Sequence, residues 1–196
     1  MAQILLTDAK LQEIKVAFEG RIHSLEVDLE KCLSTSTPGI AFFPAVLYAF
    51  ATLDFFSSYW AGWNEGRKDR NQTDRMVSFS ERFLSYKRKE AQIAVNIWRH
   101  KLMHTSEPRV VENADTGERY VWSIGPDTAE HMKLNATGTP NEFRIHFAPL
   151  MFCKELKAAV LGPDGYFAKF STSTALQQKW CSCQNEFNSY KIKLKP

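Results

Sequence analysis

The sequence predicts a mostly helical protein, a bundle of helices with a small β insertion before the last of them. Two patterns indicate this fold class. Apolar residues recur at steps of three and four over most of the first 107 residues, which is the period of an amphipathic helix. After Pro108 the pattern changes to short runs rich in valine and aromatic residues, with a glycine-containing turn between them, as in a β-hairpin. Because the chain has 196 residues and is 44% hydrophobic and 24% charged, we expect one ordinary globular domain over residues 1–196.

The N-terminal segment, residues 7–33, is predicted to form one long helix. Thr7 or Asp8 can cap its start, because their side-chain oxygens accept hydrogen bonds from free backbone N–H groups. A Ser- and Thr-rich run that ends in Pro38 and Gly39 then indicates a linker. The apolar face of the helix is predicted to consist of Leu11, Ile14, Phe18, Ile22, Leu25 and Leu29.

Residues 40–63 are the most apolar segment of the chain. Their number approaches that of a membrane span, so a transmembrane helix is one alternative. Asp54 in the middle, the polar residues that follow it and the scattered aromatics favour instead the buried centre of a bundle, without membrane contact. A carboxylate in such a helix needs a partner, because a buried unpaired charge is costly. We expect Asp54 to share a polar pocket with Arg99 or a histidine.

A positively charged window covers residues 64–90, where eight basic residues oppose five acidic ones. This excess accounts for the whole net charge of +3, so a polyanion is a candidate partner for this part of the surface. The predicted nucleic-acid contacts in the window are Arg67, Arg70 and Arg88. A solvated loop of mixed charge is the alternative interpretation of the same residues.

The rest of the chain is predicted to alternate between helical and extended segments. These are helical residues 74–86 and 91–102, as two helices or one with a kink, a hairpin at 109–122, a strand at 142–147 and helices at 148–161 and 167–191. We therefore divide the domain into a bundle core at 7–107, a β element at 108–147 and C-terminal helices at 148–196.

The cysteines are expected to be reduced and structural. Residues 4–6 are too short for the apolar core of a signal peptide and no basic residue precedes them, so we expect a cytoplasmic protein, where reduced thiols are the rule. A single residue separates Cys181 from Cys183, whereas zinc and redox motifs have two. We expect no metal or other cofactor. The remaining cysteines are Cys32 and Cys153.

The end of the 91–102 helix carries the candidate catalytic residues Arg99, His100 and His104. Pro108 follows soon after and should end the helix. An arginine can bind phosphate through its planar fork, and a histidine titrates near neutral pH, so these residues have the groups that RNA cleavage needs. Two alternatives stay open. Basic residues in a last turn also cap free carbonyl groups, and His100 with His104 has the spacing of a zinc-binding pair, although Lys101 stands where a zinc hydrolase has its catalytic glutamate.

This motif, placed at the end of a bundle helix, resembles the signature of the HEPN superfamily. In that signature an arginine is followed by a polar residue and then, after a gap of four to six, by a histidine. Here the polar residue is His100, where asparagine is the usual choice, and the gap to His104 is the shortest allowed. The resemblance covers about residues 7–107. It implies an up-and-down bundle and a metal-independent endoribonuclease that acts as a homodimer.

The resemblance also implies roles for the residues. Arg99 and His104 would be catalytic, with His100 in support. Independently of the resemblance, the cost of a charge in an apolar helix assigns Asp54 to the same pocket, and its place on the helix flank makes Lys101 a candidate RNA contact. In a regular helix Arg99 and His104 point about 140° apart, at about 100° per residue. We therefore expect a second protomer to complete the site.

A catalytically inactive HEPN-like module is the alternative function, binding RNA, a nucleotide or a partner protein. The aromatic side chains inside the positive window could then stack on bases, although their helical spacing is more typical of core. A toxin or defence role, with a cognate antitoxin or another protein partner, would be the cellular context of a nuclease. The aromatic residues concerned are Phe79, Phe83 and Tyr86.

Overall fold

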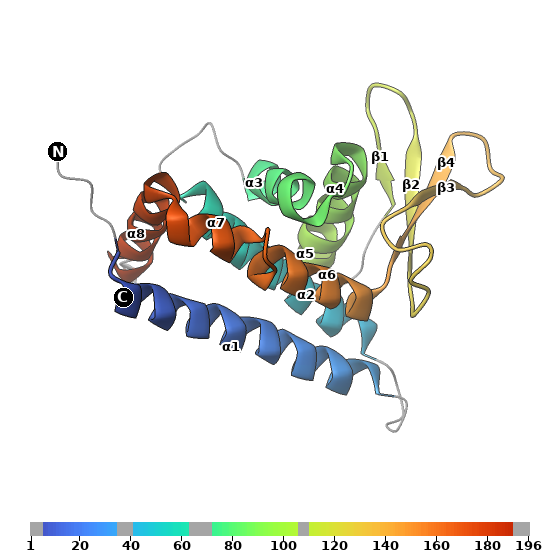
Figure 1. Cartoon of the computed structure of the whole chain (residues 1–196). Coiled ribbons are helices and arrows are strands. Elements are labelled where there is room, and N and C mark those ends of the chain that lie inside the picture. The colour runs from blue at the N-terminus through green and yellow to red at the C-terminus, as the bar shows by residue number, and fades with distance from the viewer. Residues whose placement is uncertain (1–5, 35–40, 63–71, 106–109, 190–196) are drawn as a thin grey trace, which may run out of the picture.

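A computed structural model describes residues 6–34, 41–62, 72–105 and 110–189 (Figure 1). Helices make up most of it, and one small sheet of four strands lies at one end of the helices, beside α4 and the start of α6. The predicted combination of a helical protein with a small β element is therefore confirmed. In the part of the chain that the structure describes, no helix is long and apolar enough to cross a membrane.

Helix α1 (Asp8–Leu33) is the long N-terminal helix that the periodicity predicts. Thr7 caps it, because its side chain accepts the N–H of Lys10 at 3.3 Å. The helix packs against α2 and α6 along its length (Figure 1). Five of the six residues predicted for its apolar face are buried, namely Ile14, Phe18, Ile22, Leu25 and Leu29.

Helix α2 (Phe42–Ala61) lies at the centre of the bundle, as predicted, and contacts α1, α3, α6 and α8. Phe50 illustrates its burial, since this ring is 2% exposed and lies against Trp98, Phe147 and Phe152. The helix ends at Gly62, which has a left-handed φ of 69° and donates its N–H to Ser58 O.

Two helices with π-helical segments follow. Helix α3 (Gln72–Phe79) continues as the π-helical segment η1 (Ser80–Leu84). Helix α4 (Arg88–Ala94) continues as a second π-helical segment, η2 (Val95–Lys101), and then as the short α5 (Leu102–Thr105). Ser85, with a φ of 58°, separates the two. The structure therefore has two helices here and not one kinked helix. π-Helical turns widen a helix by i→i+5 hydrogen bonding and are frequent at functional sites.

The sheet has the strand order β1-β2-β4-β3. Strands β1 (Val111–Glu112) and β2 (Arg119–Ile124) form the predicted antiparallel hairpin, and the predicted strand β4 (Glu142–Phe147) runs parallel to β2. Strand β3 (Leu134–Ala136) pairs antiparallel with β4 and was not predicted, because three residues are too few for a visible alternation.

The C-terminal part consists of α6 (Pro149–Leu161), α7 (Tyr166–Thr172) and α8 (Thr174–Ser189). The prediction of one helix over 167–191 is wrong, because the chain breaks at Ser173. The Ser173 hydroxyl accepts the N–H of Leu176, as in a helix N-cap. The Gln177 amide donates to the Phe170 carbonyl, 3.2 Å away. Two side chains thus satisfy the backbone groups that the break frees.

Candidate functional site

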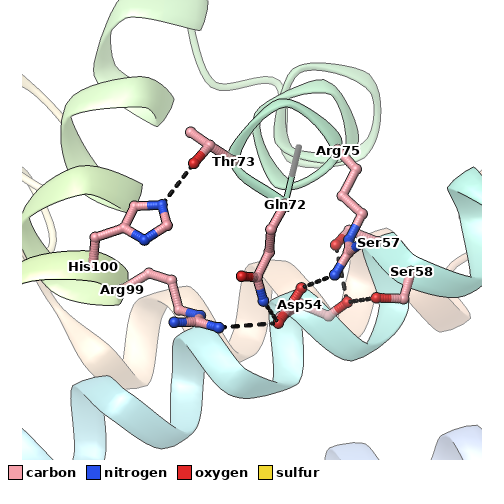
Figure 2. Close-up of polar contacts among 8 residues, drawn as sticks. All are labelled: Asp54, Ser57, Ser58, Gln72, Thr73, Arg75, Arg99 and His100. Carbon is pink, nitrogen blue, oxygen red and sulfur yellow. Dashed lines mark hydrogen bonds and ion pairs between the residues drawn. The ribbon is translucent and has the colours of Figure 1, made fainter. Parts of the chain in front are cut away.

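Asp54 lies in the second half of α2, and its carboxylate points toward α3 and η2 (Figure 2). The side chain is 18% exposed, so water reaches only part of it. The hydroxyls of Ser57 and Ser58 both donate to the Asp54 backbone carbonyl, at 2.9 and 2.7 Å. The polar residues that follow Asp54 in the sequence therefore bond to their own helix, and they leave the carboxylate to partners on other helices.

Two side chains of α3 hold this carboxylate. Arg75 Nη2 lies 2.9 Å from Asp54 Oδ1, and the Gln72 amide donates to Asp54 Oδ2. The Arg75 side chain is only 7% exposed. The sequence analysis did not assign Arg75 to the site. A signal was present, because Arg75 stands four residues before the buried Phe79 and therefore on the apolar face of its helix.

Arg99 approaches the same carboxylate from η2, on the other side from Arg75 (Figure 2). Its Nη2 lies 3.6 Å from Asp54 Oδ2, and its side chain is 12% exposed. The prediction that Asp54 and Arg99 share a polar pocket is confirmed by this ion pair. One carboxylate between two guanidinium groups leaves this cluster with one net positive charge, which suits an anion such as a phosphate.

His100 is the next residue of η2, and its Nε2 lies 2.6 Å from the Thr73 hydroxyl (Figure 2). Burial lowers the pKa of His100 below its ordinary value of 6.5, and the positive charge of Arg99 lowers it further. The ring is therefore neutral at physiological pH. A neutral imidazole can accept a proton, and here it also joins the motif helix to α3.

His104 lies on α5 with its side chain exposed. It makes no hydrogen bond or ion pair with any described residue, yet it is close enough to His100 to lower the pKa of that ring. The structure thus brings Arg99, His100 and Asp54 together in one network and leaves His104 at its edge. Despite the π-helical turns, Arg99 points inward and His104 outward.

The predicted nucleic-acid contacts are scattered. Lys101 is exposed beside the motif. Arg88 forms an exposed ion pair with Glu81, at 2.7 Å between Nη1 and Oε2, so its charge is already partly neutralised. Arg67 and Arg70 lie outside the described residues.

The aromatic residues of the positive window belong to the core and not to a stacking surface. Phe79 is buried, and its ring lies 4.8 Å from that of Phe83. Phe83 also packs against Tyr166, with ring centroids 5.9 Å apart. Tyr86 is partly buried against the core and bonds to Glu155.

No group of three or more His, Cys, Asp or Glu residues that could hold a metal ion lies within the described ranges. His131 and His146 form a β-bridge through their backbones, and their rings bond to other groups: His131 to Tyr86 and to the Ala148 N–H, and His146 to the Ser123 hydroxyl. The cysteines are free thiols, Cys153 and Cys183 buried and Cys32 and Cys181 partly so.

No protein-family model matches the chain, and comparisons with curated proteins and with solved structures also find no match. The function of the cluster therefore has to be argued from its own residues. One helix end carries Arg99, which is paired with Asp54, the neutral His100 and the exposed His104. An arginine can bind a phosphate, and a histidine can transfer protons.

Proposed function

We propose that this chain is a HEPN-like, metal-independent endoribonuclease of the cytoplasm whose site is completed at a homodimer interface. The observation that carries the proposal is the Asp54–Arg99 ion pair beside His100, at the end of a helix that presents His104 to solvent. Asp54 and Arg75 would hold Arg99 in place, and Arg99 would bind the scissile phosphate.

The reaction needs no metal ion, because RNA carries its own nucleophile. The 2′-oxygen attacks phosphorus as its proton leaves, the bond from phosphorus to the 5′-oxygen breaks, and that oxygen takes up a proton. Arg99 stabilises the extra negative charge on the phosphoryl oxygens. An imidazole can both accept and donate a proton, and His104 is the imidazole of the motif that is exposed to solvent. His100 supports the site through its bond to Thr73.

We infer the dimer because the side chains of Arg99 and His104 point in opposite directions, so that one chain alone does not bring them together. One chain directs the guanidinium inward to Asp54 and the imidazole outward. A two-fold axis near the helix end would place the His104 of each protomer beside the Arg99 of the other, since such an interface brings the same patch of both chains together. Two copies of His104 would also divide the two proton transfers.

A HEPN-like module without catalysis is the second candidate, binding RNA, a nucleotide or a protein such as an antitoxin. The specific observation in its favour is that the Arg99 guanidinium already forms an ion pair with Asp54. A phosphate must then share Arg99 with a carboxylate, which weakens the contact. Lys101 and the arginines of the window, Arg67, Arg70 and Arg88, would supply the remaining charge for binding.

The test is cleavage of single-stranded RNA by the full chain without added metal. We expect products with a 2′,3′-cyclic phosphate and no cleavage at a 2′-deoxynucleotide. His104→Ala should lower the rate by about 10²–10⁴-fold, the usual contribution of a proton-transfer group. His23→Ala is the matched control, because His23 is an exposed histidine on α1. Lys101→Ala should weaken RNA binding and its salt dependence more than the chemical step.

Arg99 needs a variant that keeps its charge, since Arg99→Ala would leave Asp54 and Arg75 without this partner. Arg99→Lys keeps the charge and removes the planar fork, so we expect a folded dimer with much reduced cleavage. Cleavage that persists in His104→Ala, or that EDTA abolishes, contradicts the mechanism. A monomer at micromolar concentration in sedimentation contradicts the shared site. A folded dimer that binds RNA without cleaving it favours the second candidate.

A further inference from the structure

A second polar site lies away from the motif, where the start of α4 meets β3 and α6. It is a cavity of about 510 Å³. That volume falls within the range of about 300–1,000 Å³ that is usual for small-molecule sites. Its lining includes Tyr86, Glu90, His131 and Glu155, none of which belongs to the motif cluster.

Tyr86, His131 and Glu155 form a chain of hydrogen bonds in the wall of this cavity. The Ala148 N–H donates to His131 Nδ1 at 3.0 Å, so Nδ1 carries no proton and Nε2 does. His131 Nε2 lies 3.0 Å from the Tyr86 oxygen, and the Tyr86 hydroxyl donates to Glu155 Oε2. The His131 side chain is only 2% exposed, and that of Glu155 is 28% exposed.

This chain of hydrogen bonds holds the Glu155 carboxylate in a fixed position. Burial raises the pKa of Tyr86, and the nearby Glu155 charge raises it further, so the phenol keeps its proton and remains a donor. The Tyr86 hydroxyl donates to Glu155 Oε2, and His131 Nε2 lies 3.4 Å from the same oxygen.

Glu90 adds a second carboxylate to the wall. Its side chain is 12% exposed, and its Oε2 is buried with no hydrogen-bond partner among the described residues. A buried carboxylate oxygen without a donor is unfavourable, and a ligand with N–H groups would supply one. Lys87 Nζ lies 3.8 Å from Glu90 Oε1, on a side chain that is 86% exposed.

The cavity is lined by charges of both signs, which differ in burial. The carboxylates of Glu90 and Glu155 are 12% and 28% exposed, whereas the side chains of Lys87 and Lys133 are exposed. The backbone is also unusual here, because two of the lining residues, Ser85 and Met132, have left-handed φ values of 58° and 56°. Non-glycine residues in that conformation are uncommon and cluster at functional sites.

We propose that this cavity binds a small molecule with an N–H-rich head, of the ammonium or guanidine type, and an anionic tail. The head donates hydrogen bonds to the carboxylates of Glu155 and Glu90. The tail, a carboxylate or a phosphate, lies between Lys87 and Lys133. A free amino acid such as arginine and a nucleotide such as guanosine monophosphate share this chemistry.

The test is calorimetric titration of the full chain with L-arginine and, separately, with guanosine 5′-monophosphate. We expect one of the two probes to bind, and which one binds identifies the source of the ligand. Agmatine, which is arginine without its carboxylate, should bind more weakly than arginine if arginine is the ligand. Glu90→Gln should weaken binding about 10- to 100-fold, as expected for a lost hydrogen bond to a charged group. Glu19→Gln, at an exposed carboxylate of α1, is the matched control.

Glu155→Gln removes the same charge but also disturbs the Tyr86 and His131 bonds, so its melting temperature must be measured beside its affinity. Arg99→Lys should leave binding unchanged, which separates this site from the nuclease site. Two results overturn the proposal. One is that neither probe binds with a Kd below about 1 mM. The other is that a probe binds Glu90→Gln as tightly as the unchanged protein.

Discussion

Replacing Asp54 by asparagine tests the central contact of the structure. The carboxylate accepts hydrogen bonds from Arg75 and Gln72 and forms a longer ion pair with Arg99. Asparagine has nearly the same size and can still accept a hydrogen bond. The change removes the charge and one of the two acceptor oxygens, so asparagine can accept from Arg75 or from Gln72 but not from both. It also leaves two guanidinium groups close together without a counter-ion.

The expected loss of stability follows from how deeply these groups are buried. The side chains of Arg75 and Arg99 are 7% and 12% exposed. Removing one partner of a fully buried ion pair destabilises a protein by about 3–5 kcal/mol. Asp54 is 18% exposed and water hydrates part of the site, so we expect the free energy of unfolding to fall by about 2–4 kcal/mol. In a domain of this size that lowers the melting temperature by roughly 4–16 °C.

The measurement is urea unfolding of both proteins at pH 7, followed by circular dichroism. Glu81→Gln is the matched control, because Glu81 also has an arginine partner at 2.7 Å, but on the exposed surface. An exposed pair of this kind contributes less than about 1 kcal/mol. If Asp54→Asn is no less stable than Glu81→Gln, the cluster does not hold the helices together and our account of Arg99 is wrong.

Three further predictions concern stability. The pKa of His100 in the folded protein lies below the ordinary 6.5 that it has when unfolded, so the unfolded chain binds the proton first as the pH falls. Stability should therefore decline as the pH drops from about 7 through the lowered pKa, and His100→Gln should flatten this decline in urea midpoints; an unchanged slope would argue against it. Gly20→Ala should stabilise α1 by up to about 1 kcal/mol, because a Cβ there has no neighbour within 4 Å. Gly62→Ala should destabilise by more than about 1 kcal/mol, because its φ is left-handed and its Cβ would lie 2.9 Å from Lys179 Cβ; equal melting temperatures for the two variants would contradict both expectations.

Local sequence patterns were sufficient to predict an element where the spacing of apolar residues or a turn alone determines it. The three- and four-residue spacing of apolar side chains predicted α1, since burial of one face is what holds such a helix in place. The polar turn between β-rich runs predicted the hairpin of β1 and β2. Predictions of boundaries were weaker. The break at Ser173 depends on hydrogen bonds from Gln177 to the preceding turn, which a helical period does not reveal.

Part of the candidate site could likewise be predicted from the sequence, and part could not. Sequence reasoning expected a partner for Asp54, because a charge in an apolar helix must be compensated, and it named Arg99 among the candidates. It could not choose Arg75, because that choice depends on how α3 packs across α2. It also could not foresee the cavity at Tyr86, His131 and Glu155.

The amino-acid sequence by itself determined the helical class, the long amphipathic α1, the buried α2 and the need of Asp54 for a counter-ion. Each of these follows from the period of apolar residues or from the cost of burying a charge. Only the tertiary structure decided which groups meet, because Asp54 and Arg99 are 45 positions apart and Tyr86 and Glu155 are 69 apart. Contacts over such separations depend on the packing of whole helices and strands, and no local pattern encodes them.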